Sequence, residues 1–144
     1  MELTPQWLAG FFDGEGYIGV AWNKTRKTFY PRLTIANTHL PTLELIQKQF
    51  GGSLHRSYGN KKSKSYMCYS LHWGHKSVRE LLEKIAPYLV VKKEQVDAIL
   101  QQWNWDKPQW TNLTEFERDQ RVQLASTLQE LKRKRYTLMK EEVH

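Results

Sequence analysis

Two carboxylates stand beside glycines in the stretch LAGFFDGEG, residues 8 to 16. Asp13 and Glu15 fall at the expected C-terminal end of a helix, where the backbone dipole and unpaired carbonyls already concentrate negative charge. Together with the Gly14 carbonyl they form an oxygen-rich cluster suited to a hard divalent cation such as Mg2+. A structural alternative stays open at this point, in which Asp13 caps a neighbouring backbone amide and Glu15 is merely exposed.

The same helix carries two glycines that are costly for an isolated helix. Gly10 and Gly14 lie four residues apart and therefore share one face, flanked by Trp7 and Phe11. Each glycine destabilises a helix interior by roughly 1 kcal/mol relative to alanine. Small residues at this spacing allow a second helix to approach closely. We therefore expect another helix to pack on this face.

Apolar periodicity predicts the elements that must position these residues. We expect an α+β domain with one antiparallel sheet, helices on one of its faces and the other face free. The spacing predicts helices and strands in the order αββαββαα, followed by a C-terminal helix. The expected ranges are helix 5–14, strands 17–23 and 29–37, helix 41–50, strands 53–58 and 65–73, a helix ending before Pro87, a helix ending near Trp103, a connection over 104–112, and a helix from Thr114 with Phe116, Leu124, Leu128, Leu131 and Leu138 on its apolar face.

Composition narrows the class of protein. The chain has 144 residues, which predicts one domain, and its net charge of +7 favours an anionic partner such as nucleic acid. Cys68 is the single cysteine, which excludes an intramolecular disulfide and a cysteine-based zinc site. No apolar run has the length of a membrane span, and the first residues lack the basic leader of a signal peptide, so we expect an intracellular protein without a membrane partner.

Alternation along the strands predicts a polar and basic face on the sheet, because successive side chains point to opposite sides. Cations at hairpin tips can hold phosphates while shorter polar side chains read base edges in the major groove. Basic tips are also common solubility devices, so this pattern alone leaves that alternative open. The expected DNA-binding residues are Asn23, Lys24, Arg26, Lys27, Arg32, Thr34, His55, Ser57, Lys61, Lys62, Lys64, Tyr66, Ser70 and His72.

LAGFFDGEG resembles the signature of the LAGLIDADG homing endonucleases. Leu8, Ala9, Gly10, Asp13 and Gly16 match directly, while Glu15 replaces the second aspartate of the signature. The similarity extends over residues 3 to 103, where the predicted order matches the αββαββα fold of that family. Residues 1–103 would then form the endonuclease core, and 104–144 a connection and helical extension of the same domain.

The resemblance implies a site-specific enzyme of the single-motif type. It would be a homodimer that cleaves both strands of a long, roughly palindromic double-stranded DNA site by metal-dependent phosphodiester hydrolysis. Trp7, Gly10, Phe11 and Gly14 would line the dimer interface. We expect such a protein to act in intron homing, with the DNA of a bacterial, phage or organelle genome.

The resemblance also implies roles for individual residues. Glu15 and the Gly14 carbonyl would ligate Mg2+, or another divalent cation such as Mn2+. Asp13, the remaining acidic candidate, would be mostly structural and cap the partner helix. Lys92 fits the family's catalytic lysine, with Lys93 as the alternate and Gln95 assisting, while Asn37 or His39 would position water.

Two other classes of function stay open on sequence alone. A non-catalytic LAGLIDADG-type binder, either an RNA-splicing maturase or a DNA-binding regulator, would keep the acidic pair only as helix-end structure. A purely structural or protein-interaction module would show no salt-dependent DNA binding.

Overall fold

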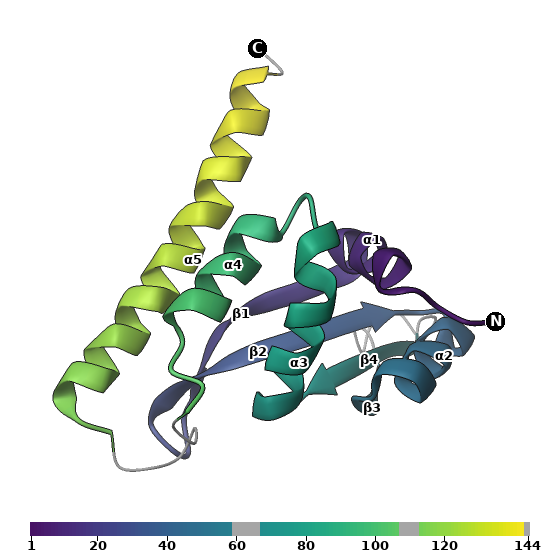
Figure 1. Ribbon diagram of the computed structural model, residues 1–144, viewed down its shortest axis with the longest axis horizontal. Coiled ribbons are helices and arrows are strands. Elements are labelled where there is room, and N and C mark those ends of the chain that lie inside the picture. Colours follow the sequence, from purple (N-terminus) through teal and green to yellow (C-terminus); the bar gives the residue numbers. More distant parts are fainter. Residues whose placement is uncertain (59–66, 107–112, 143–144) are drawn as a thin grey trace.

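The computed structural model describes residues 1–58, 67–106 and 113–142, with side chains described for 1–56, 67–106 and 113–134. Its elements follow the predicted order, with one short 3-10 turn added before the fourth helix (Figure 1). They are α1 (Pro5–Glu15), β1 (Gly16–Asn23), β2 (Thr28–Asn37), α2 (Leu40–Phe50), β3 (Ser53–Tyr58), β4 (Met67–Trp73), α3 (His75–Ile85), η1 (Ala86–Tyr88), α4 (Lys93–Gln102) and α5 (Glu115–Glu142).

The four strands form one antiparallel sheet in the order β1-β2-β4-β3. Ile18 lies opposite Leu33, which in turn lies opposite Trp73, so these apolar side chains share one face. The helices cover that face, and the opposite face carries no helix in the described part of the chain (Figure 1). This architecture confirms the predicted α+β fold.

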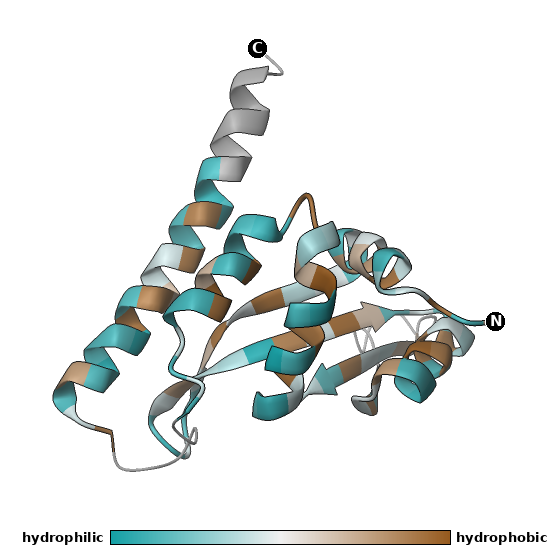
Figure 2. Cartoon of the chain, in the orientation of Figure 1, coloured by the Kyte–Doolittle hydropathy of each residue, from teal (hydrophilic) through white to brown (hydrophobic). Residues whose placement is uncertain are grey.

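The core lies between the covered face of the sheet and the helices, where apolar residues of both layers meet (Figure 2). Leu8 and Phe12 of α1 are fully buried there. A Cβ at Gly16 would overlap the Phe12 ring, so only glycine allows α1 to turn directly into β1 at this point. The motif helix is therefore fixed to the sheet through its buried side.

The C-terminal helix α5 joins the same core along part of its length. Leu124 and Leu128 are buried, as predicted, whereas Phe116 is 70% exposed and does not belong to the apolar face. Thr114 and Glu117 form the predicted capping box, with Thr114 Oγ1 accepting from the Glu117 amide at 3.2 Å and Glu117 Oε1 accepting from the Thr114 amide at 3.3 Å. The Leu138 side chain lies outside the described residues. No described helix is both long enough and apolar enough to cross a membrane.

Candidate functional site

The four predicted interface residues lie on one exposed face of α1. A Cβ built at Gly10 or at Gly14 would meet no described atom within 4 Å outside the helix's own backbone, so no packing contact in the described part of the chain requires glycine at either position. Trp7 is 39% exposed and stacks on Phe11 with ring centroids 5.1 Å apart. This face is therefore smooth, partly aromatic and open to a second helix.

Asp13 is fully engaged within its own chain. Its Oδ2 accepts a hydrogen bond from the Val90 amide at 2.8 Å, and its Oδ1 accepts one from the Lys92 amide at 3.0 Å. Within one chain the loop before α4 supplies both amides, as in the structural alternative, and the capping of a partner helix by Asp13 stays a prediction. Asp13 therefore fixes the C-terminal end of α1 to the start of α4.

Lys92 lies at the same end of α1 as Glu15. Its Nζ donates to the Asp13 carbonyl at 2.6 Å, which places a cation where the helix dipole concentrates negative charge. Lys93 points elsewhere, with its Nζ 3.4 Å from the Ala86 carbonyl oxygen and 3.5 Å from Asp97 Oδ2. Geometry therefore favours Lys92 over Lys93 as the lysine that accompanies the acidic motif.

Glu15 ends α1 and is exposed. No ion pair within 4 Å and no hydrogen bond holds its carboxylate among the residues that the structure describes. The Gly14 carbonyl belongs to the last turn of α1, and the residue four positions further along, Ile18, is in β1 and continues no helix. The same described residues contain no cluster of three or more histidine, cysteine, aspartate or glutamate side chains that could hold a metal ion.

The remaining catalytic candidates have structural contacts. Asn37 Oδ1 accepts from the His39 amide at 2.8 Å, and His39 Nδ1 lies 2.6 Å from Thr42 Oγ1 at the start of α2. Gln95 is buried in the first turn of α4. Because Ile35 pairs with Gly16, the end of β2 that carries Asn37 lies beside the end of α1 that carries Glu15.

The uncovered face of the sheet carries a hydrogen-bonded polar cluster. Thr34 Oγ1 lies 3.2 Å from His72 Nδ1, and Ser70 Oγ lies 2.9 Å from His72 Nε2. The His55 ring packs edge-on against His72 at 4.9 Å between centroids. Burial lowers the pKa of His72, and the charges of His55 and Arg32 lower it further, so its ring favours the neutral form.

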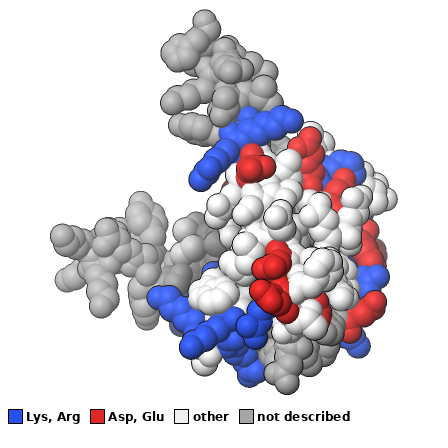
Figure 3. Space-filling view, turned by 90° about the vertical axis from the view of Figure 1, so that its left-hand side faces the viewer, with Lys and Arg blue, Asp and Glu red and all other residues white. Residues whose placement is uncertain are grey.

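The tip of the β1–β2 hairpin is basic and exposed. Lys24, Arg26 and Lys27 are all exposed there. Asn23 has a different role, because its Oδ1 accepts from the amides of Thr25 and Arg26, each at 3.0 Å, and so shapes the turn. Figure 3 shows Lys and Arg side chains gathered at its lower left, on the side of the sheet that the helices leave uncovered, while Asp and Glu lie further toward the helices.

The second hairpin is described only in part. The described residues do not include Lys61, Lys62, Lys64 and Tyr66, and of Ser57 the backbone alone is described, opposite Cys68.

Tyr17 of β1 is a residue that the sequence reasoning omitted from the DNA-binding face. It is 44% exposed and pairs with Thr34, and a Cβ at Gly19 would come within 2.5 Å of its hydroxyl, so the ring covers Gly19. Strand alternation alone already placed Tyr17 on the polar side.

Comparison with known proteins adds independent findings. A family model described as LAGLIDADG endonuclease matches residues 8–103. A "probable intron-encoded endonuclease aI2" of Debaryomyces hansenii is 39% identical over 67 residues, which are 46% of this chain and 9% of that protein's length.

Solved structures are similar over most of the chain. One is the homing endonuclease I-CvuI in complex with a DNA target in the presence of Mg, at 26% identity and a TM-score of 0.60, covering 88% of this chain and 80% of that chain. Another is the homing endonuclease I-TnaI, at 24% identity and a TM-score of 0.64, covering 92% and 96%. The second likeness concerns the fold alone.

Proposed function

The chain belongs to the LAGLIDADG endonuclease family, and on this premise we propose that it is a homing endonuclease that cuts double-stranded DNA. Its finer activity, in our proposal, is metal-dependent hydrolysis of both strands of a long, roughly palindromic site by a homodimer. The family model covers residues 8–103, whereas the curated relative shares only 9% of its own length with this chain. The activity is therefore argued from this chain's own residues.

One observation carries the proposal, namely that α1 presents an open glycine face and ends in Glu15, whose carboxylate has no ion pair or hydrogen bond among the described residues. A second copy of α1 on the Gly10 and Gly14 face would bring two Glu15 side chains to the same end of the paired helices. The two chains would thereby place two Glu15 carboxylates and two Gly14 carbonyls close together, which is twice the number of oxygen ligands that one chain supplies. The exposed apolar side chains of Trp7 and Val90, beside α1, support a partner at this face.

The donor set fits a hard divalent cation. Glu15 carboxylate oxygens and the Gly14 carbonyl are the ligand types that Mg2+ prefers, and Mn2+ accepts them as well. When bound, such an ion would supply Lewis acidity toward the phosphodiester and its attacking water. Lys92 adds a positive charge at the same end of α1, where it would stabilise negative charge on a phosphate.

The uncovered face of the sheet is proposed as the DNA-reading surface. Arg32 is exposed in the middle of β2 and can donate to base edges, while Thr34, Ser70 and His72 form one fixed polar array beside it. Lys24, Arg26 and Lys27 at the hairpin tip would contact phosphates. A pair of such sheets in a homodimer would read a symmetric site.

The test separates cleavage from DNA binding. Glu15→Gln removes one negative charge but keeps the side chain's length, so we expect cleavage in Mg2+ to fall by at least about a hundredfold while DNA affinity is retained. Glu44→Gln, at an exposed position on α2, is the matched control and should cleave like the unmodified protein. Cleavage by Glu15→Gln at the unmodified rate would show that Glu15 is not a metal ligand. Salt-dependent DNA binding without any cleavage by the unmodified protein would instead favour the non-catalytic binder.

A further inference from the structure

The C-terminal helix α5 lies outside residues 8–103, which the family model matches, yet it contacts the strands that carry the proposed reading face. Leu124 and Leu128 dock its middle onto the core. Arg121 precedes these two leucines and Lys132 follows them, and both cationic side chains donate hydrogen bonds to the first hairpin, formed by β1 and β2. Figure 1 shows α5 running alongside α4 and β1.

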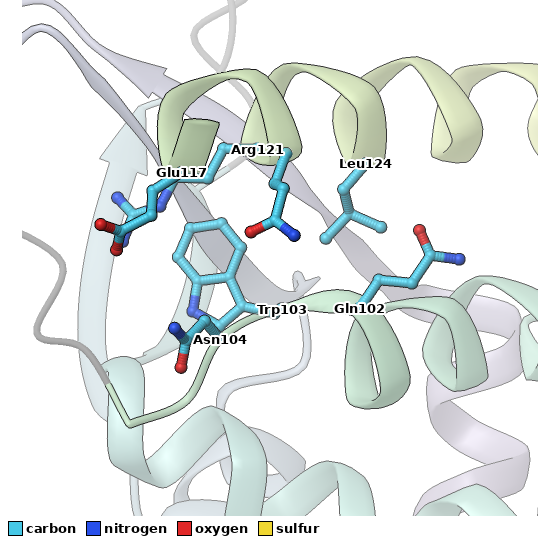
Figure 4. Close-up of a pocket in the computed structure, with 7 residues that line it drawn as sticks. Gln102, Trp103, Asn104, Glu117, Arg121 and Leu124 are labelled. Carbon is cyan, nitrogen blue, oxygen red and sulfur yellow. The ribbon is translucent and has the colours of Figure 1, made fainter. Parts of the chain in front are cut away.

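Arg121 reaches the base of the hairpin tip. Its Nη1 donates to Thr28 Oγ1 at 3.0 Å and to the Phe29 carbonyl at 3.2 Å, at the point where β2 begins after Lys27. Its guanidinium lies 4.4 Å from the centre of the Trp103 ring, and Figure 4 shows the two side chains close together between α4 and α5. Arg121 is only 7% exposed, so these contacts compensate a desolvated charge and would be costly to lose.

Beside Arg121, the first hairpin and α5 are not closely packed by apolar side chains. A solvent-open pocket of about 350 Å3 lies between part of the hairpin and α5, with Trp22 and Phe29 on the hairpin side and Arg118 and Val122 on the helix side. Trp22 is 51% exposed and Val122 is 49% exposed. Hydrogen bonds from Arg121 therefore bridge a region where the two surfaces are not fully packed together.

Lys132 contacts the first hairpin further along, near the start of β1. Its Nζ donates to the Ile18 carbonyl at 2.9 Å and lies 4.4 Å from the centre of the Tyr17 ring. Because β1 is an edge strand, this carbonyl has no strand neighbour on its outer side, and Lys132 occupies that position. Ile18 follows Glu15 by three residues, so this contact lies close to the end of α1.

The spacing of the two cations matches the length of the strand. Arg121 and Lys132 are eleven residues apart, which corresponds to about 16 Å along a helix. Ile18 and Asn23, which pairs with Thr28, are five residues apart, which corresponds to about 17 Å along a strand. Helix α5 therefore contacts the first hairpin at two separate points, the start of β2 through Arg121 and Ile18 of β1 through Lys132.

We propose that α5 is a positioning element for DNA recognition, in which Arg121 and Lys132 hold the first hairpin in the arrangement that reads DNA. The proposal rests on the proposed function, since it concerns how the same sheet binds its target. A hairpin that is held in place before binding does not have to be ordered by the DNA. If only a fraction of molecules have the competent arrangement, the apparent dissociation constant rises by the inverse of that fraction.

The experiment compares Arg121→Met and Lys132→Met with Arg133→Met in the full chain. Arg133 is the exposed neighbour of Lys132, so its substitution removes the same charge without removing a contact to β1. DNA cleavage would be measured against concentration on the preferred site and on a library that varies each base pair in turn. For Arg121→Met and Lys132→Met we expect the half-saturating concentration to rise about tenfold, while the maximal cleavage rate stays within about twofold. Discrimination between base pairs should fall at the positions that the first hairpin contacts. Arg121→Lys keeps a donor and should recover most of the discrimination.

Two results would overturn the proposal. One is discrimination and half-saturation in Arg121→Met and Lys132→Met that equal those of Arg133→Met. The other is a uniform loss at all base pairs that follows the fraction unfolded, measured by thermal melting, because that pattern belongs to general destabilisation. Failure of the unmodified protein to bind or cut any DNA would instead refute the proposed function itself. That result is obtained without the variants, so the two failures are distinguishable.

Discussion

Replacing Asp13 by alanine should loosen the junction between α1 and α4. The carboxylate accepts two backbone amide hydrogen bonds, at 2.8 Å from Val90 and at 3.0 Å from Lys92. These bonds join residues that are 77 and 79 positions apart, so they fix tertiary structure and not a local turn. Their loss would also free the backbone of Lys92, whose Nζ contacts the Asp13 carbonyl.

The magnitude follows from the type of bond. A hydrogen bond to a charged group contributes about 1.5–3 kcal/mol, and the Asp13 side chain is only half-buried, which favours the lower end. Asp13→Ala should therefore lower the free energy of unfolding by about 2–3 kcal/mol for the pair of bonds. Asp13→Asn keeps one acceptor oxygen but places an NH2 group against the second amide. Its free energy of unfolding should therefore fall by about half as much as that of Asp13→Ala, or slightly more.

Urea denaturation at a fixed protein concentration measures this effect. With a denaturant dependence of about 2 kcal/mol per molar urea, the midpoint of Asp13→Ala should fall by about 1–1.5 M. The control is Asp119→Ala, an exposed position on α5, which should stay within about 0.5 kcal/mol of the unmodified protein. An Asp13→Ala midpoint equal to that of the control would refute the reasoning that these two bonds fasten α1 to α4.

Two further predictions concern the pH response and the open face of α1. Burial lowers the pKa of both His72 and His75, with the charge of Arg121 adding to the effect on His75, so the unfolded chain binds these protons more tightly than the folded chain. Stability should hence fall as the pH drops from above 6.5 through the lowered pKa values, and a melting temperature that rises from pH 7.5 to pH 5.5 would contradict this. DNA phosphates near His72 should raise its pKa, so His72→Gln should weaken any gain in DNA affinity on acidification, as measured by titration at the two pH values. Gly10→Leu should prevent self-association in sedimentation velocity experiments, because the Cβ of the new side chain meets no described atom outside the helix's own backbone and the side chain would instead crowd the face proposed for a second α1. A persisting dimer with unchanged affinity would place the interface elsewhere.

Local signals in the sequence determined the elements and their type. Thr4 and Pro5 start α1, with Thr4 Oγ1 accepting from the Trp7 amide at 3.1 Å, and the strand alternation around Ile18 and Leu33 placed the right side chains in the core. The motif also assigned a glycine face and an acidic end to one helix. These features depend on neighbours within a few residues, so periodicity and capping residues are enough to predict them.

Only the tertiary structure decided how distant segments share the site. It directed both Asp13 oxygens to amides of Val90 and Lys92, and it brought the Nζ of Lys92, and not that of Lys93, to the end of α1. It likewise joined Arg121 to the start of β2, 93 residues away from Thr28 in the sequence. Each of these contacts depends on the packing of a helix against elements far away in the chain, and spacing along one segment carries no record of such packing.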